Sequence, residues 1–417
     1  MKRRKFVPSG YLRSNAIWLV GGSASQSGVA FVVSLFLMGM LLPEDFGRYA
    51  LISANVALVN AILNLRLPDA VVRMSADELN RDLGSLVAIH LGQILFVSAL
   101  SVGILWVLGL FGGEALILVM AIAVNNWTAL LTRLYEREFK YRNIAIVENG
   151  ASISVNILSA VGVLLGVGGI VLFLRDLFRG VLQFSILVIM RRLPNLEFAR
   201  PDREAFVRLR HKVSGIWIDG IAEQLYHRLT ILLLGAIATE REVGLFFQAR
   251  RLASVPNELM MPVTYRMAYN YFSHKVQGRE RQRKLGLLIA MEIVVLTAIA
   301  GIAAFWGKDL ILLFFNEHWL QVVGILLALL GFMVLQPVFE TLKSFAMAEN
   351  RVGRFVVLGR TFQFLSLFAG YIAYNAFSLE PVMAVAYALS LGYLLAFLVL
   401  IAKYFLGADV AESIEGL

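Results

Sequence analysis

Residues 381–402 read PVMAVAYALSLGYLLAFLVLIA, a run of 22 residues without a charged side chain. An α-helix needs about 20 mainly apolar residues to cross the hydrocarbon core of a bilayer. The run therefore predicts a transmembrane helix. A barrel strand is the poorer interpretation, because it would alternate apolar and polar residues over about 10 positions.

Similar runs recur along the whole chain, bounded by polar residues or by Gly and Pro. The expected spans are 16–40, 49–70, 85–111, 115–132, 144–165, 169–190, 213–237, 243–272, 285–306, 320–342, 355–376 and 381–402. The eighth is long and contains Pro256 and Pro262, so we expect it to be kinked or partly unwound. The fold class is an all-α integral membrane protein with twelve transmembrane helices.

The composition excludes most other classes of protein. Of the 417 residues 59% are hydrophobic and 16% are charged, whereas about a quarter of residues are charged in soluble domains. There is no cysteine, which excludes disulfide scaffolds, thiol nucleophiles and thiolate metal sites. The five histidines lack metal-ligand spacing, and no phosphate-binding loop occurs. We therefore expect neither an enzyme nor a cofactor.

Lys and Arg are distributed very unevenly between the two sides of the expected membrane. With the N-terminus in the cytoplasm, cytoplasmic segments carry 27 of them and the opposite side carries 3. This positive-inside pattern predicts that both termini are cytoplasmic and accounts for most of the net charge of +9. No nucleic-acid partner is needed. The first apolar stretch is too long for a signal peptide, so we expect it to be retained as a helix.

An internal repeat divides the chain into two halves. A shift of 197 residues aligns Leu42–Tyr49 with Thr239–Phe246, and each octet follows the first span of its half. The expected parts are an N-lobe (1–195), a cytoplasmic linker (196–212) and a C-lobe (213–417). Because each half has six spans, both enter the membrane in the same sense. We expect two pseudosymmetric six-helix lobes around a central cavity.

Three stretches carry a resemblance to a known family. Similarity to Wzx-type polysaccharide and O-antigen flippases of the multidrug/oligosaccharidyl-lipid/polysaccharide (MOP) superfamily is found in Leu41–Leu51, in Leu232–Val263, and in Leu310–Trp319 followed by Phe339–Asn350. The resemblance covers nearly the whole chain and implies a MATE-like fold. It departs at His227-Arg228, where the family often has an Asp-Arg pair, which puts an acidic coupling role there in doubt.

The resemblance also implies a function. A flippase of this kind moves polyprenyl-diphosphate-linked oligosaccharide from the cytoplasmic to the periplasmic leaflet of the bacterial inner membrane, by alternating access and with an ion gradient as the drive. The product would be exopolysaccharide or lipopolysaccharide O-antigen, with a polymerase and glycosyltransferases as partners. The alternatives are a cation-coupled multidrug exporter of the same superfamily and an integral-membrane polysaccharide polymerase.

Ionisable residues inside spans are candidates for ion coupling, because a buried charge is costly in lipid. Asp219, Glu223 and His227 share one helix face at four-residue spacing. Such a column is typical of a proton or sodium relay, and Glu258 in the next span is a further candidate. A structural ion pair is equally compatible, with Arg228 or Arg251 neutralising Glu223.

Arginines within the spans are candidates for a cationic substrate cavity, since arginine binds phosphate and carboxylate bidentately. These candidates are Arg66, Arg175, Arg179, Arg228, Arg251 and Arg360. We expect Asp176 to pair with Arg179. Arg66 and Arg360 lie near span ends, where snorkelling to the interface is the alternative. Asparagines of the first half suit sugar hydroxyls or, equally, hydrogen bonds between helices.

Overall fold

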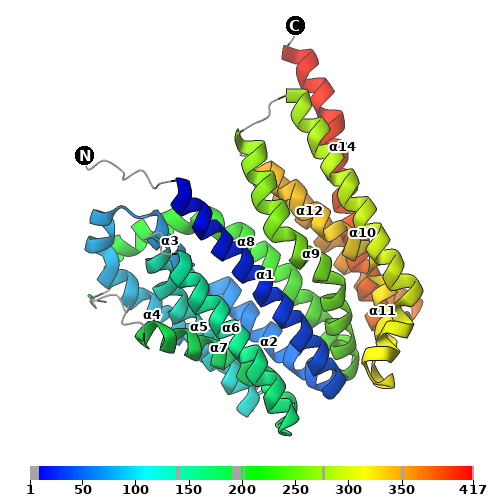
Figure 1. Cartoon of the computed structure of the whole chain (residues 1–417), viewed down its shortest axis with the longest axis horizontal. Helices are drawn as coiled ribbons and strands as arrows, with labels where there is room; N and C mark the ends of the chain where they lie inside the picture. The colour runs from blue at the N-terminus through cyan, green and yellow to red at the C-terminus, as the bar shows by residue number, and fades with distance from the viewer. Residues whose placement is uncertain are drawn as a thin grey trace. The chain divides into compact units, whose positions relative to one another are not determined.

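The computed structural model describes residues 9–137, 141–189, 199–200, 202–274, 278–348 and 352–415, and every regular element in these ranges is a helix (Figure 1). The elements of the first half are α1 (Ser9–Met40), α2 (Pro43–Leu63), α3 (Leu67–Arg73), α4 (Ala76–Val107), α5 (Gly113–Arg137), α6 (Tyr141–Leu164), the 3-10 turn η1 (Gly168–Ile170) and α7 (Val171–Ile189). Those of the second half are α8 (Arg203–Ile237), α9 (Glu240–His274), α10 (Gly278–Phe314), the turn η2 (Glu317–Trp319), α11 (Gln321–Ala328), α12 (Leu330–Ala348), α13 (Val352–Phe377) and α14 (Pro381–Glu415).

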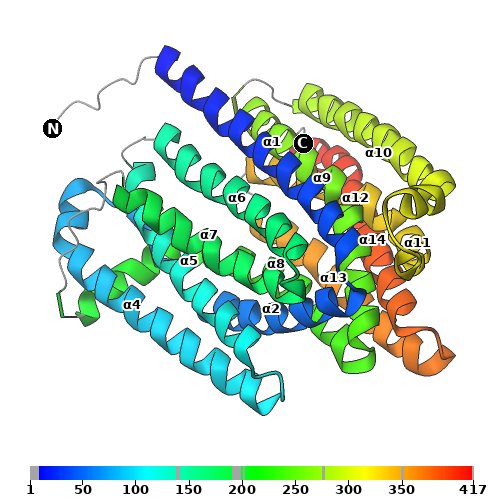
Figure 2. The ribbon, with the colours of Figure 1, turned by 60° about the horizontal axis from the view of Figure 1, so that its bottom comes forward.

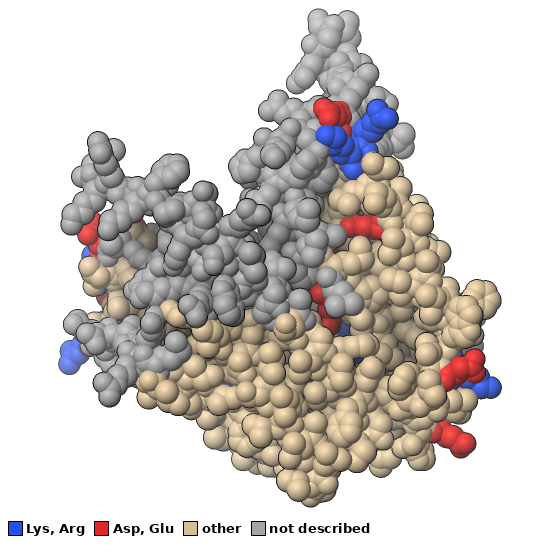
Figure 3. Space-filling view, viewed as in Figure 1, with Lys and Arg blue, Asp and Glu red and all other residues tan. Residues whose placement is uncertain are grey.

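The all-helical membrane fold predicted from the sequence is confirmed. Within the described residues six helices are long and apolar enough to cross a bilayer, or seven if the bent pair α11 and α12 forms one span. One of them is Pro381–Ala402, the run quoted above. Figure 3 shows a broad face that is almost free of charged side chains, as lipid requires. The count of twelve spans stays a prediction.

The expected tenth span is a broken helix. α11 and α12 meet at Leu329 with a bend of 55°. The cause is Ser390 of α14, whose hydroxyl donates to the carbonyl of Ala328 (2.6 Å) and accepts from the amide of Phe332 (3.2 Å). In one continuous helix the amide of Phe332 would donate to the carbonyl of Ala328. The inserted side chain of Ser390 therefore interrupts the backbone hydrogen bonding of the helix.

The eighth span was expected to be kinked or partly unwound, and only the unwinding is contradicted. The partial unwinding expected around Pro256 and Pro262 is absent, since α9 is helical from Glu240 to His274. A membrane helix tolerates the lost amide donors where neighbouring groups satisfy the freed carbonyls.

The chain forms two compact units, and we describe each by itself. Unit 1 comprises residues 1–41 and 52–221. In it α1 packs on α6, α6 and α5 pack on α7, and α4 packs on α5 (Figure 2). A core at one end buries Leu67, Val71, Leu86 and Leu130 completely.

Unit 2 comprises residues 42–51 and 222–417. Its helix α12 packs against α9, α10 and α14, while α13 lies along α14. The largest buried side chains here are aromatic: Trp319, Tyr226, Tyr393, Phe246, Phe332, Phe339 and Phe345. Of the three boundaries between the units, one lies between α1 and α2, and the other two fall inside helices, in α2 and in α8. α8 begins within the segment expected to link the two lobes.

Candidate functional site

A cluster of charged side chains lies buried in unit 2, where α8, α12 and α13 contribute one member each. Glu223 of α8 binds Lys343 of α12 (3.0 Å) and Arg360 of α13 (3.2 Å) through the same carboxylate oxygen. The side chains of Lys343 and Arg360 are 9% and 4% exposed, whereas that of Glu223 is 32% exposed. The anion is therefore the member of this trio that solvent or a ligand can reach.

Neighbouring groups fix the two cations in place. Lys343 lies 3.8 Å from Glu340, one turn earlier on α12. Arg360 donates to the amide oxygen of Gln363 (2.9 Å), and its guanidinium lies over the ring of Phe339 at 5.3 Å. Such stacking on an aromatic face suits arginine better than lysine, because the guanidinium is planar and weakly hydrated.

A second, partly buried arginine, Arg250 of α9, adjoins this cluster. Arg250 contacts Nδ1 of His227, donates to the His227 carbonyl (3.3 Å) and lies over the Phe332 ring at 5.9 Å. A guanidinium is always charged and can only donate. A hydrogen bond between these two groups therefore requires Nδ1 of His227 to act as the acceptor.

Aromatic side chains surround both arginines. Tyr226 contacts Tyr393 and Phe364 edge-on, and Tyr393 in turn contacts Phe332 and Phe339, with ring centroids 5.2–6.3 Å apart. Charges within such an apolar shell interact strongly, because little water screens them. The arrangement can hold an anion between Lys343 and Arg360, and Glu223 occupies that position.

The structure brings several predicted residues of unit 2 together and separates others. Glu223 and Arg360 are partners, so Glu223 takes part in an ion pair, one of the two alternatives that the sequence left open. Lys343, from a helix far away in the sequence, is a partner that the sequence did not predict. His227 meets Arg250 instead of extending a column from Glu223. Arg228 and Arg251 are partly buried, Glu258 is exposed, and the side chain of Asp219 lies outside the described residues.

The other predicted arginines lie in unit 1. Arg66 has left-handed backbone (φ 53°) before α3 and pairs with Asp69 at 2.9 Å, which also binds Arg133 at 3.1 Å. Arg175 pairs with Asp176 at 3.8 Å, whereas we had expected Arg179 to be the partner; Arg179 is exposed. Within the described residues the six arginines are therefore divided between the two units.

Amide side chains of unit 1 form a network between helices. Asn126 donates to Asn60 (2.8 Å) and accepts from Asn64 (3.2 Å), while Gln93 donates to Asn64 (3.0 Å). The network joins α2, α4 and α5. Of the two roles that the sequence left open for these asparagines, hydrogen bonding between helices is the one observed.

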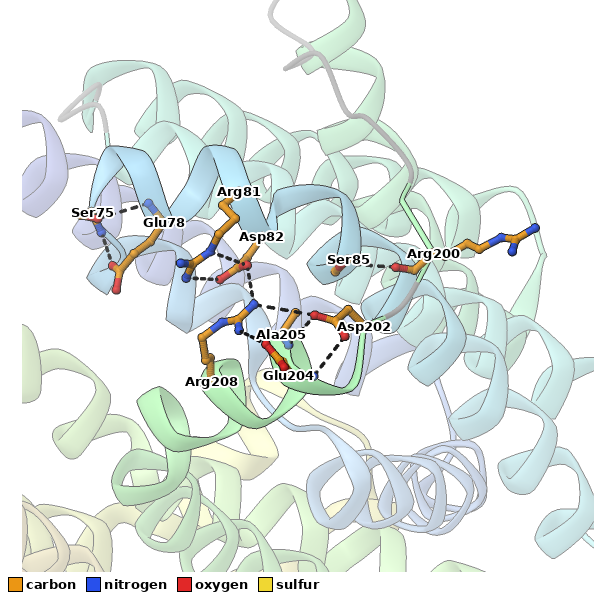
Figure 4. A network of polar contacts seen from close by, with 10 residues as sticks. All are labelled: Ser75, Glu78, Arg81, Asp82, Ser85, Arg200, Asp202, Glu204, Ala205 and Arg208. Atoms are coloured by element: carbon orange, nitrogen blue, oxygen red, sulfur yellow. Dashed lines mark hydrogen bonds and ion pairs between the residues drawn. The ribbon is translucent and has the colours of Figure 1, made fainter.

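The first turns of α8 are attached to α4 by a buried carboxylate (Figure 4). Asp82, 4% exposed, accepts two hydrogen bonds from Arg81 (3.0 and 3.1 Å) and one from Arg208 of α8 (3.0 Å). Arg208 also reaches Glu204, which is 84% exposed. This contact fixes the beginning of α8 within unit 1.

Two further charged residues, Lys343 and Glu292, were not predicted as site residues from the sequence. Lys343 follows the expected tenth span and was counted with the cytoplasmic charges, although its spacing from Glu340 gave a signal that the two share a helix face. Glu292 is a single acid within an apolar run. Its burial depends on which face of α10 is turned inward, and we return to it below.

The fold and the buried charges define a multi-pass helical membrane protein, and comparisons with known proteins narrow the class. The family model described as polysaccharide biosynthesis protein matches residues 36–324. The chain therefore belongs to this family, as the resemblance of its sequence motifs indicated. A comparison with curated proteins returned no match.

Solved structures of the MOP superfamily share the fold. A multidrug resistance MATE family transporter in an inward-facing conformation superposes with a TM-score of 0.67 and 14% identity over 95% of this chain and 99% of that one. The lipid II flippase MurJ in an inward closed conformation gives a TM-score of 0.70 and 14% identity over 93% and 87%. A MOP superfamily transporter from Pyrococcus furiosus gives 0.51 and 16% over 97% and 91%.

Proposed function

We propose that this chain is a flippase that moves polyprenyl-diphosphate-linked oligosaccharide from the cytoplasmic to the periplasmic leaflet of the bacterial inner membrane. Its product would be a surface polysaccharide, exopolysaccharide or lipopolysaccharide O-antigen. Membership of the polysaccharide biosynthesis family and the MOP fold support this function. The observation that carries it is the buried trio of Glu223, Lys343 and Arg360.

The trio suggests how a diphosphate would be bound. Arg360 and Lys343 are preorganised cations, and Glu223 is the more exposed partner that a stronger anion would displace. A diphosphate carries more charge than a carboxylate and matches the planar donors of arginine. Binding would leave Glu223 without its counter-ions, so that it takes up a proton or another cation. Ion coupling and substrate binding would thereby share one site.

Orientation and partners complete the proposal. Both termini would be cytoplasmic, as the positive-inside pattern predicts. The substrate would come from glycosyltransferases on the cytoplasmic side and pass to a polymerase in the periplasm. The polyprenyl chain would stay in the bilayer during transport, since transferring its apolar surface into water is unfavourable.

Two alternative functions, a multidrug exporter and a polysaccharide polymerase, can be distinguished from a flippase. The MATE structures belong to multidrug transporters, and the Pyrococcus furiosus structure is described as a MOP superfamily transporter with reversed binding-pocket polarity and a different function. One fold can therefore serve several substrates. A site for cationic drugs should contain an excess of acidic groups, whereas the trio contains two cations and one carboxylate. A polymerase would change polymer length without changing the leaflet in which the repeat unit accumulates.

The test is genetic complementation with leaflet-resolved detection of the lipid-linked repeat unit. In a deletion strain the wild-type gene should restore export. Arg360→Ala and Lys343→Ala should leave the repeat unit in the cytoplasmic leaflet, whereas Arg241→Ala, which changes an exposed arginine, should complement. Full export by both cluster variants at normal expression would refute the site, and unchanged leaflet distribution in the deletion strain would refute the function.

A further inference from the structure

Glu292 is a buried carboxyl group within the apolar part of α10. The helix runs from Gly278 to Phe314, and Glu292 lies about 12 Å along it from Lys284, the last charged residue before it. Its neighbours Leu287, Met291, Val294 and Val295 are 51–69% exposed and form the lipid-facing side. Glu292 itself is 3% exposed. It therefore interrupts the opposite, inward-facing stripe, whose other members are Leu285, Ile289, Leu296 and Ala300.

The carboxyl group has one hydrogen-bond donor. The hydroxyl of Thr341 on α12 donates to Oε1 of Glu292 at 2.8 Å. Oε2 is fully buried and has no hydrogen-bond partner among the described residues. A carboxylate needs several donors or a cation to remain ionised away from water, whereas a protonated carboxyl is neutral and costs far less to bury.

Charged groups on the surrounding helices have other partners. On α12 the nearest in sequence to Thr341 are Glu340 and Lys343, which belong to the cluster around Glu223. On α10 itself, Lys284 pairs with Glu280 at 2.8 Å. α11 also packs on α10 and carries no charged residue between Gln321 and Ala328. Glu292 makes no ion pair with any residue that the structure describes.

We propose that Glu292 is a proton-binding site, neutral in the state seen here, which releases its proton when α10 and α12 change their packing during transport. The step is the reversible reaction of the Glu292 carboxylate with one proton from the aqueous phase. Only the place of proton release in the transport cycle rests on the proposed transport function. The proton site is separate from the Glu223 cluster. The two are connected through α12, because Thr341 lies between Glu340 and Lys343 in the sequence.

Infrared spectroscopy of the full-length protein in lipid nanodiscs tests the protonation directly. Wild-type protein at neutral pH should show the C=O stretch of a protonated carboxyl, shifted in D₂O. Glu292→Gln should lose this band, whereas Glu280→Gln, an exposed acid on the same helix, should retain it. Thr341→Val should move the band to higher frequency, because the carbonyl of the Glu292 side chain loses its hydrogen-bond donor. This variant tests the assignment of the band to Glu292 even if Glu292→Gln fails to fold.

Two results would overturn the proposal. One is a Glu292→Gln spectrum identical to that of wild type. The other is a protonated band that disappears when sodium replaces choline in the buffer, which would make Glu292 a metal-cation site.

Flipping in vesicles then tests the place of the proton in the cycle. A pH gradient should accelerate wild-type flipping of lipid-linked oligosaccharide, and the ratio of rates with and without the gradient should fall to about one in Glu292→Gln. A gradient response that Glu292→Gln retains in full would refute the coupling role. If wild-type protein flips no lipid-linked sugar, the transport function fails, while the infrared result still decides whether Glu292 binds a proton.

Discussion

Gly47 and Gly244 face each other where the first turns of α2 and α9 cross in unit 2. A Cβ atom built on Gly47 would lie 3.1 Å from the amide nitrogen of Gly244, and one built on Gly244 would lie 2.9 Å from that of Gly47. Each would also overlap a carbonyl of the facing helix, that of Glu240 or Pro43. The shift of 197 residues relates Gly47 to Gly244 and Pro43 to Glu240. Equivalent residues of the two repeated octets therefore contact each other in the structure.

A third contact follows the same symmetry. Glu44 pairs with Arg241 at 3.8 Å, and these two residues are again 197 positions apart. Residues that correspond in the two halves thus meet directly, as they do on a two-fold axis. The glycines are required here by close approach of backbone to backbone, which no side chain permits.

Alanine at either glycine should separate the two helices. We expect Gly47→Ala and Gly244→Ala each to lower the free energy of unfolding by about 1–3 kcal/mol, because the added Cβ atom would overlap rigid backbone of the facing helix. Thermal unfolding in detergent measures the loss. Gly103→Ala is the control, since nothing lies within 4 Å of its Cβ position. Equal stability of Gly47→Ala and Gly103→Ala would show that the helices do not cross this closely.

Removal of the buried carboxylate at the start of α8 should loosen that helix. In Asp82→Asn, Arg81 and Arg208 lose the anion that they share, so we expect a clear fall in Tm and faster proteolysis before α8. Glu204→Gln removes an exposed partner of the same Arg208 and should leave Tm nearly unchanged. A larger effect of Glu204→Gln than of Asp82→Asn would contradict this assignment.

The hydroxyl of Ser390 should contribute more to the free energy of unfolding than the hydroxyl of an ordinary serine in a membrane helix. Ser390→Ala leaves the carbonyl of Ala328 and the amide of Phe332 without their partner and should cost about 1–3 kcal/mol. Ser185→Ala removes an exposed hydroxyl that bonds only within its own helix and is the matched control. A neutral Ser390→Ala variant would mean that the bend between α11 and α12 persists without this bridge.

The partnership of Glu223 and Arg360 predicts a rescue of stability without a rescue of transport. Arg360→Leu removes one of the cations that bind Glu223 and should destabilise the protein by about 1–3 kcal/mol. Adding Glu223→Gln should restore most of this loss, because it removes the negative charge that Arg360 balances. Export should stay low in both variants. Restored export in the double variant would show that the trio only supports the fold.

Hydrophobic runs were sufficient to predict helices long and apolar enough to cross a membrane, because a span is determined by length and local composition. The run Pro381–Ala402 is one of them and lies within α14. The break at Leu329 was not predictable, since its cause is Ser390, about sixty residues further along the chain. The octets containing Gly47 and Gly244 were identified as equivalent from the sequence, but their mutual contact required the packed structure.

The candidate site was predicted only in part. Glu223 lies inside an apolar run, whereas for Arg360, near a span end, snorkelling to the interface was the alternative. The choice of partner depends on which helices are neighbours, so Arg228 and Arg251 were the partners that the sequence could offer. Lys343 was missed because a basic residue at a span end also fits the cytoplasmic interface, and its spacing from Glu340 does not show which way their shared face points.

The most direct measurement is the leaflet distribution of the lipid-linked repeat unit in a strain that lacks this gene. We predict that the repeat unit accumulates in the cytoplasmic leaflet, that drug tolerance is unchanged, and that the wild-type gene restores periplasmic delivery while Arg360→Ala does not. An unchanged leaflet distribution together with altered drug tolerance would contradict the account and favour a multidrug exporter.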